Sequence, residues 1–319
     1  MLEDEYVQIA WMYHMEGLTQ AEIADRMGTT RLAVQRALQK CLDDGIVRVS
    51  IEHVDSRCAR LASSLQKEFE LTYAHVIPTP SNDERLKEAL GKASARAFAR
   101  YVKPGSVIGV GWGSTIAQTA RHMSRRQVDG LTVVSLLGGL TKGAAISPYE
   151  VAWRISDVLG ATCYYLAAPA IVDDQATRDM LLGISTIQTT LELGRQASLA
   201  LIGIGEVSHH CTFARVGMIT PEEIDELAEK GAVADILGTF VTLDGEPVDH
   251  NINQRTVSPG LETLKQIGNV FAVAGGTSKA RTIYAALQTG CIRYLVTDAQ
   301  AAENVLLLKD LMSSRRPGE

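Results

Sequence analysis

Residues 104–298 repeat one pattern: an apolar, β-rich run, a glycine-containing loop and an amphipathic helix. Several of the runs are apolar throughout, which is typical of strands buried on both faces of a sheet. Helices between such strands predict a mostly parallel α/β sheet. The predicted strands are Ser106–Val110, Leu131–Leu137, Ala161–Leu166, Leu199–Ile204, Ile236–Leu243, Asn269–Ala274 and Ile292–Thr297, preceded by one more strand in YAHVIPTP, residues 73–80.

Residues 19–38, TQAEIADRMGTTRLAVQRAL, predict two short helices joined by a tight turn. Thr19 and Glu22 form a T-x-x-E capping box, which starts the first helix. Ala24 is small where the two helices must approach each other. Gly28 stands at the turn, where a positive φ costs little only for glycine. Together with a buried Val34, these features predict a DNA-binding helix-turn-helix.

The second helix of this pair presents the side chains that a DNA-reading helix needs. Thr29 or Thr30 can cap its first turn. The residues expected to face inward are Leu32, Val34, Ala37 and Leu38. Arg pairs with guanine and Gln with adenine in the major groove, whereas contacts to phosphates only position the domain. The residues predicted to bind DNA in one of these two ways are Thr19, Gln20, Thr30, Arg31, Gln35, Arg36 and Lys40.

The predicted domain boundary lies between residues 54 and 55. Before it, a first helix over Glu3–Met15 covers the helix-turn-helix, and IVRVSIEH, residues 46–53, alternates like a half-exposed strand and predicts a small wing. Arg48 of this wing either contacts a phosphate or is simply solvated. After the boundary, a polar connector helix over residues 55–70 carries an apolar stripe at spacing four. The stripe either pairs with another subunit or docks on the large domain, residues 55–319.

Charge and cysteine content restrict the class of protein further. The net charge is −6, and residues 1–60 carry seven basic and ten acidic residues, which counts against strong non-specific DNA binding. Between Arg26 and Lys40, however, all four charged residues are positive. The five cysteines are scattered, without a C-x-x-C pair, which favours reduced thiols and a cytoplasmic protein without a zinc site. No membrane span, signal peptide, cofactor or metal site is predicted.

The loop GVGWGSTIA, Gly109–Ala117, follows an apolar strand and precedes a helix. Its glycines expose backbone N–H groups, and Ser114 and Thr115 add hydroxyls at a helix N-terminus, so the loop predicts a phosphate cradle. Ser114 stands where a dinucleotide fingerprint needs its last glycine, and no lysine follows as in a P-loop. The alternative is a tight turn that binds nothing.

Other loops at the carboxyl ends of strands are further candidates for ligand binding. LLGGLT spans Leu136–Thr141, and GAVADILG spans Gly231–Gly238. Asp235 in the latter directly precedes a predicted strand and either binds sugar hydroxyls or caps a turn. Lys279 of AGGTSKA either reaches a ligand oxygen or is an exposed helical lysine, and Asp298 is a candidate cap of the last helix. No catalytic constellation is identifiable.

The segments GLTQAEIADRMGTTRLAVQRALQKCLDDGIVRVSI, GWGST, LLGG, GAVADILG, AGGTSK and VTD together resemble the SorC family of bacterial sugar-responsive regulators. The resemblance covers nearly the whole chain. It implies a sensor domain with the fold of sugar-phosphate isomerases, a phosphorylated sugar or polyol as effector, and a homodimer or homotetramer on operator DNA. It also implies a set of effector-binding residues: Gly113, Ser114, Thr115, Gly138, Gly139, Asp235 and Lys279. Gln35 departs from the family's frequent serine, so the operator sequence is not transferable.

The sequence therefore predicts a transcriptional regulator of a sugar or sugar-alcohol operon, controlled by a phosphorylated effector. Repression and activation both remain open. The enzyme alternative is a sugar-phosphate isomerase or lactonase with an appended helical domain, which leaves the DNA-reading helix unexplained. An NAD-dependent enzyme ranks last, because Asp129 precedes the strand Leu131–Leu137 instead of ending it.

Overall fold

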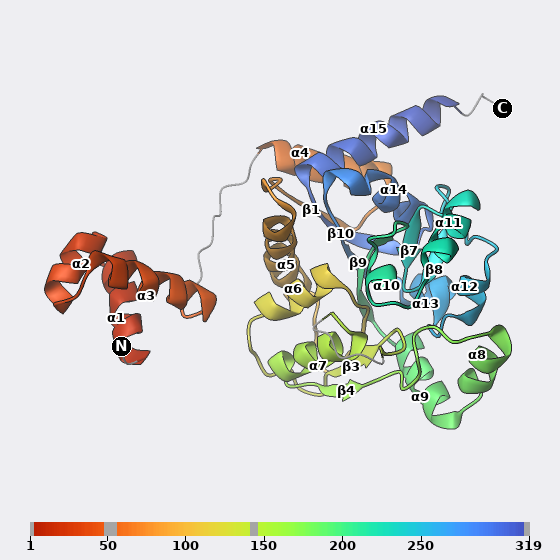
Figure 1. The fold of residues 1–319 in the computed structure, drawn as a ribbon, viewed down its shortest axis with the longest axis horizontal. Coiled ribbons are helices and arrows are strands. Elements are labelled where there is room, and N and C mark those ends of the chain that lie inside the picture. Colours follow the sequence, from red (N-terminus) through yellow and green to blue (C-terminus); the bar gives the residue numbers. More distant parts are fainter. Residues whose placement is uncertain (1–2, 48–55, 141–145, 316–319) are drawn as a thin grey trace. The chain divides into compact units, whose positions relative to one another are not determined.

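The computed structural model describes residues 3–47, 56–140 and 146–315 (Figure 1). The contacts within the chain divide it into two compact units, Met1–Val54 and Asp55–Glu319. Within the described residues, no helix combines the length and the apolar character that crossing a bilayer requires.

The first unit contains three helices, α1 (Glu3–His14), α2 (Gln20–Met27) and α3 (Arg31–Asp43). The predicted capping box is present, since the Glu22 N–H donates to Thr19 Oγ1 and the Thr19 N–H donates to Glu22 Oε2. Gly28 ends α2 in the left-handed conformation at φ 61°. The helix-turn-helix predicted from these residues is confirmed.

The core of this unit differs from the prediction at one residue of α3. Its buried side chains are Val34, Ala37, Leu38 and Cys41. Leu32 is 55% exposed, so its predicted inward orientation is wrong. Two residues correspond to about 200° around a helix, and a buried Val34 therefore places Leu32 on the opposite face. Except for Ile46 and Val47, the predicted wing lies outside the described residues, and Arg48 lies outside them too.

The second unit is built on a seven-stranded sheet in the order β1-β10-β9-β5-β2-β3-β4, and every neighbouring pair is parallel. The strands are β1 (Tyr73–Ile77), β2 (Val107–Val110), β3 (Thr132–Ser135), β4 (Thr162–Tyr164), β5 (Leu199–Gly203), β9 (Val270–Val273) and β10 (Ile292–Asp298). The predicted parallel α/β fold is confirmed.

Helices cover both faces of this sheet, because successive side chains of each strand point to opposite sides. In β5, Leu199 and Leu201 pack against one helical layer, and Ala200 and Ile202 pack against the other. The first layer contains α5 (Asp83–Ala99), α6 (Ser114–His122) and α7 (Pro148–Leu159). The second contains α4 (Ser56–Glu68), α9 (Ser185–Arg195), α13 (Gly260–Ile267), α14 (Ala280–Gln288) and α15 (Ala299–Arg315).

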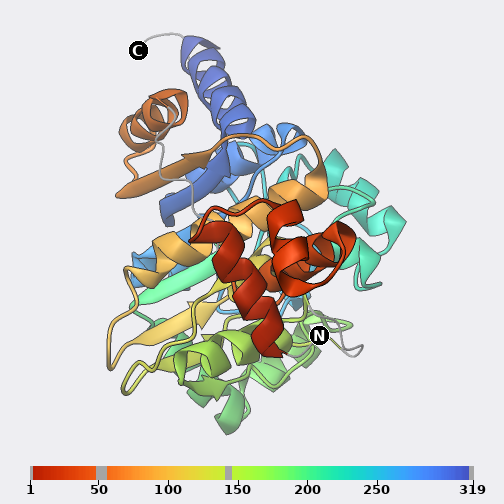
Figure 2. The ribbon, with the colours of Figure 1, turned by 90° about the vertical axis from the view of Figure 1, so that its left-hand side faces the viewer.

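The connector helix docks on its own large domain. Leu65 of α4 is fully buried, and Arg57 forms an ion pair with Glu303 of α15 at 2.7 Å. Figures 1 and 2 both show α4 beside α15. Of the two alternatives for its apolar stripe, the structure therefore shows intramolecular docking.

The predicted strand Ile236–Leu243 is wrong as a member of the large sheet. The segment instead contributes the end of β7 (Ala234–Ile236) and all of β8 (Thr239–Val241). With β6 (Gly205–Glu206), these two strands form a separate three-stranded antiparallel sheet. Leu237 and Gly238 both have positive φ, at 52° and 79°, as a two-residue hairpin turn requires. The remaining helices are α8 (Gln175–Leu182), α10 (Thr212–Arg215), α11 (Pro221–Glu229), α12 (Asn251–Arg255) and the 3₁₀ turn η1 (Thr277–Lys279).

Candidate functional site

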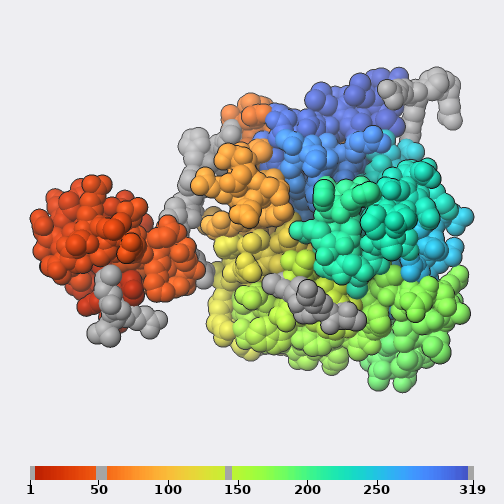
Figure 3. Space-filling view, in the orientation of Figure 1, coloured from red at the N-terminus to blue at the C-terminus, as the bar shows by residue number. Residues whose placement is uncertain are grey.

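A cavity of about 600 Å³ lies where the strand order of the large sheet reverses. From β2 the chain proceeds outward through β3 and β4, and then returns to β5 on the other side of β2. Open α/β sheets bind ligands at such a point, outside the carboxyl ends of the strands. The segments after β2, β5 and β9 line the cavity, together with the start of α5 and part of the small sheet. In the space-filling view, α5 (orange) and α10–α11 (green-blue) reach the same face of this unit (Figure 3).

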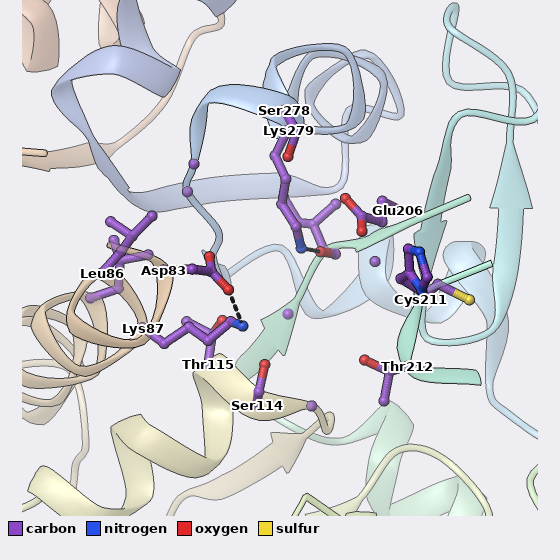
Figure 4. Close-up of a pocket in the computed structure, with 18 of the residues that line it drawn as sticks. Asp83, Leu86, Lys87, Ser114, Thr115, Glu206, Cys211, Thr212, Ser278 and Lys279 are labelled. Atoms are coloured by element: carbon purple, nitrogen blue, oxygen red, sulfur yellow. Dashed lines mark hydrogen bonds and ion pairs between the residues drawn. The ribbon is translucent and has the colours of Figure 1, made fainter. Parts of the chain in front are cut away.

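The turn after β2 opens the N-terminus of α6 toward the cavity. Gly113 has φ 108°, a conformation that only glycine adopts easily, and no side chain caps the helix. The first N–H groups of a helix have no acceptor within it, so they attract anions. Ser114 and Thr115 line the same cavity, and Figure 4 shows the Ser114 hydroxyl pointing into it.

The turn after β9 has a similar backbone, but its N–H group already has a hydrogen-bond acceptor within the protein. Gly276 has φ 111°, and its N–H donates to Asp298 Oδ2 at 2.6 Å. The other carboxylate oxygen of the buried Asp298 accepts from the Thr79 hydroxyl at 2.7 Å and from the Gln300 N–H at 3.2 Å. Asp298 is thus more than a helix cap, because it joins two walls of the cavity.

Lys279 follows the second turn and enters the cavity rather than projecting from a helix. Its Nζ donates to the Ile204 carbonyl at 2.9 Å. Burial lowers the pKa of Lys279, and the neighbouring carboxylate of Glu206 opposes that shift. The exposed-lysine alternative is therefore wrong.

Asp235 lies within β7 rather than in a loop before a strand, which corrects the prediction. It is paired with Gly205, and its Oδ1 accepts the Gly238 N–H at 2.6 Å. Burial raises the pKa of Asp235 to about 7, although the Gly238 hydrogen bond and the charge of Lys279 act in the opposite direction. A carboxyl group that changes protonation near neutral pH can both donate to and accept from ligand hydroxyls.

Gly138 and Gly139 do not line the cavity. Their N–H groups donate to the carbonyls of Val257 at 3.1 Å and Ala168 at 2.7 Å. A Cβ at Gly138 would lie 2.5 Å from the Pro169 oxygen. These glycines therefore allow close backbone packing, and the structure does not bring them together with Ser114 and Thr115.

Comparison with known proteins identifies the class of this chain. Residues 55–307 match the family described as "Putative sugar-binding domain", and residues 4–57 match the MarR family. The chain is 31% identical to the erythritol catabolism regulatory protein EryD of Brucella abortus, covering 94% of this chain and 95% of the relative. It is 33% identical to the transcriptional regulator LsrR of Klebsiella pneumoniae, covering 97% and 94%.

A solved structure with the same architecture is the full-length sorbitol operon regulator SorC of Klebsiella pneumoniae. The TM-score is 0.73 at 26% identity, over 95% of this chain and 98% of that one. The chain belongs to the SorC family of sugar-binding transcriptional regulators. Its relatives and structural neighbours are regulators and not enzymes, so the isomerase or lactonase alternative is not supported.

In this SorC-family regulator, the predicted DNA-reading side chains are exposed on α3. Arg31, Gln35 and Arg36 have no hydrogen-bond or ion-pair partner within the described part of the chain. Lys40 differs, because it forms an ion pair with Asp44 at 2.7 Å.

The other predicted DNA contacts lie at helix starts. Gln20 begins α2, and Thr19 and Thr30 cap α2 and α3. The Thr30 hydroxyl oxygen accepts the Ala33 N–H at 3.2 Å, which leaves its proton available to a phosphate.

The prediction missed several cavity residues because they lie on elements that carry no glycine-rich motif. Figure 4 shows Asp83 and Lys87 entering from α5, and Glu206 and Thr212 from the segment after β5, where Cys211 also lines the cavity. Nothing in the local sequence distinguishes Lys87 from an ordinary solvated helical lysine. Within the described residues, no group of three His, Cys, Asp or Glu could hold a metal ion.

Proposed function

We propose that this regulator senses a phosphorylated sugar or polyol in the cavity and controls an operon for the uptake or catabolism of such a compound. The observation that carries the proposal is the open N-terminus of α6, with the positive-φ Gly113 before it and two hydroxyls beside it. A phosphate fits this arrangement because the N–H groups, the helix dipole and the hydroxyls all favour an anion. The names of two relatives, an erythritol catabolism regulator and a sorbitol operon regulator, support a polyol.

The polar groups opposite the proposed phosphate suit the rest of such a ligand. Asp235 and Lys279 are the groups proposed to bind its hydroxyls. Gly138 and Gly139 take no part in this proposal, since their N–H groups already have backbone acceptors.

DNA binding is assigned to residues 1–54 and effector binding to residues 55–319. Arg31, Gln35 and Arg36 read base edges, while Thr19, Gln20, Thr30 and Lys40 position the helix on phosphates. The protein acts in the cytoplasm as a homodimer or homotetramer. The effector changes DNA affinity only by its different affinities for two arrangements of that assembly.

A thermal-shift screen tests the effector class. Each sugar or polyol is paired with its phosphate ester, because a ligand that binds only the native state raises the melting temperature. We expect a larger shift for the ester. Equal shifts for ester and free polyol would contradict a phosphorylated effector.

Fluorescence anisotropy with duplexes from the protein's own promoter region tests the DNA interface. Arg31→Ala and Gln35→Ala should each weaken specific binding by roughly 1–3 kcal/mol and leave effector binding intact. Unchanged DNA affinity in both variants would show that α3 does not read the operator.

A further inference from the structure

Two charged side chains of α5 face the cavity at its wall. Asp83, in the first turn of α5, forms an ion pair with Lys87 one turn later, and both residues line the cavity (Figure 4). The Asp83 side chain is 71% exposed and the Lys87 side chain 34%. The lysine is therefore the more enclosed partner, and the carboxylate is well solvated.

Lys87 stands on a helix that is fixed against the phosphate cradle. Gly91, one turn after Lys87, packs so closely on α6 that a Cβ there would lie 2.5 Å from the Cβ of Gln118. The buried hydroxyls of Ser94 and Thr119 lie 2.6 Å apart, and Thr119 Oγ1 donates to the Thr115 carbonyl at 3.0 Å. The backbone that carries Lys87 and the backbone that carries Thr115 thus form one rigid unit.

We propose that Lys87 supplies the cation for an anion bound at Ser114 and Thr115, and that Asp83 holds the Lys87 ammonium until the anion displaces it. This inference rests on the proposed function of the cavity. The glycine loop itself contains no lysine, so any cation beside the anion must come from another element, and Lys87 of α5 lines the same cavity. Asp83 remains stable after release, because the N-terminal turn of α5 favours a negative charge.

The ion pair also gives the site a preference among anions. A ligand must compete with a carboxylate for the same ammonium, so a monoanion gains little from the exchange. A phosphate ester carries nearly two negative charges at neutral pH and accepts hydrogen bonds at three oxygens. The pair therefore favours a phosphate ester over a carboxylate or an uncharged polyol.

The same helix provides a matched control. Glu88 and Lys92 form a second ion pair at the same spacing on α5, and neither residue lines the cavity. Calorimetric titration of the full chain with erythritol phosphate, and separately with inorganic phosphate, compares Lys87→Met with Lys92→Met and Asp83→Asn with Glu88→Gln. Comparing the affinities of the two probes shows whether the loop at Ser114 and Thr115 binds free phosphate by itself or binds it only as part of a polyol ester.

We expect Lys87→Met to weaken binding of both probes about tenfold or more, as for the loss of a charge-assisted hydrogen bond. Asp83→Asn should strengthen binding about two- to fivefold, since an exposed ion pair opposes the exchange only weakly. The two control variants should bind as the wild type does. Equal losses in Lys87→Met and Lys92→Met, or no gain in Asp83→Asn, would overturn the inference.

Two outcomes separate this inference from the proposed function. If Ser114→Ala with Thr115→Ala abolishes binding while Lys87→Met retains it, the inference is wrong and the proposed function stands. If the wild type binds erythritol no more weakly than erythritol phosphate, the proposed function itself fails. Circular dichroism and the melting temperature of each variant check that the fold is intact.

Discussion

The two glycine turns beside the central strand β5 have nearly the same backbone but different surroundings. Gly113, after β2, and Gly276, after β9, have φ values of 108° and 111°, and neither following helix is capped by a side chain. The Gly276 N–H, however, is already bound by the carboxylate of Asp298, whereas the Gly113 N–H donates to a backbone carbonyl, that of Ile146.

The side chains beside the two turns also differ. At the second turn, the Lys279 ammonium interacts with the carboxylates of Glu206 and Asp235, and also with the Lys87 and Asp83 pair of α5. The first turn presents the hydroxyls of Ser114 and Thr115, and the Lys87 side chain lines the cavity beside them (Figure 4). The first loop is therefore the one we propose as the anion site, because no internal carboxylate accepts a hydrogen bond from its Gly113 N–H.

The largest expected effect is on the pH dependence of stability, and it concerns Asp235, one of the carboxylates that interact with Lys279 near the second turn. Because its folded pKa is raised to about 7, the folded protein holds a proton that the unfolded chain releases above about pH 4. Stability should therefore fall as pH rises from about 4 to 7, by up to about 4 kcal/mol at roughly 1.4 kcal/mol per pKa unit. Asp235→Asn should remove that fall in calorimetric melting curves, and the exposed Asp129→Asn should not. Parallel curves for wild type and Asp235→Asn would contradict the raised pKa.

The next effect compares the hydroxyls of the two turns. Ser114→Ala with Thr115→Ala should cost about 3 kcal/mol of affinity for a phosphorylated polyol, or roughly a hundredfold, and far less for the unphosphorylated form. Thr277→Ala with Ser278→Ala should cost less than about 1 kcal/mol of affinity for the same ligand. The reason is that the Gly276 N–H of that turn already donates to the Asp298 carboxylate, so we expect no ligand anion there. Calorimetric titration measures both. A larger loss at Thr277 and Ser278 would reverse the assignment of the anion site.

Removing the internal carboxylate of the second turn should have a smaller effect. In Asp298→Asn, an amide N–H₂ group replaces one carboxylate oxygen, so one of the groups that donate to Asp298 loses its acceptor. The substitution should destabilise the fold by about 2 kcal/mol. Asp174→Asn is the control, since Asp174 caps α8 at the exposed Thr177 N–H and asparagine caps equally well. Urea unfolding measures both variants. Equal midpoints for the two would show that Asp298 does not hold the second turn.

The smallest effect tests the shared backbone of the turns. Gly113→Ala and Gly276→Ala should each destabilise the protein by roughly 1–2 kcal/mol, because alanine is strained at these φ values while no atom lies within 3.4 Å of either added Cβ. Only Gly113→Ala should also weaken binding of the phosphorylated ligand. Equal binding losses in the two variants would mean that both turns hold the anion.

The sequence alone was sufficient where structure depends on neighbours along the chain. The capping box at Thr19 and Glu22, the left-handed Gly28 and the seven parallel strands follow from side-chain hydrogen bonds, φ preferences and hydrophobic periodicity. Each acts within a few residues, so its pattern is visible without the fold. The prediction of Ile236–Leu243 as one strand was wrong because the same apolar residues also fit a hairpin. The prediction that Leu32 faces inward was wrong because helical spacing places it opposite the buried Val34.

Only the tertiary structure decided which residues meet in the cavity. Lys87, Glu206 and Asp298 lie on separate elements, and nothing in the sequence around Lys87 sets it apart from Lys92. The close packing of Gly91 on α6 brings Lys87 to the cradle, while backbone pairing takes Gly138 and Gly139 away from it. Such encounters depend on how strands and helices pack over long separations in the chain, and no local pattern encodes that packing.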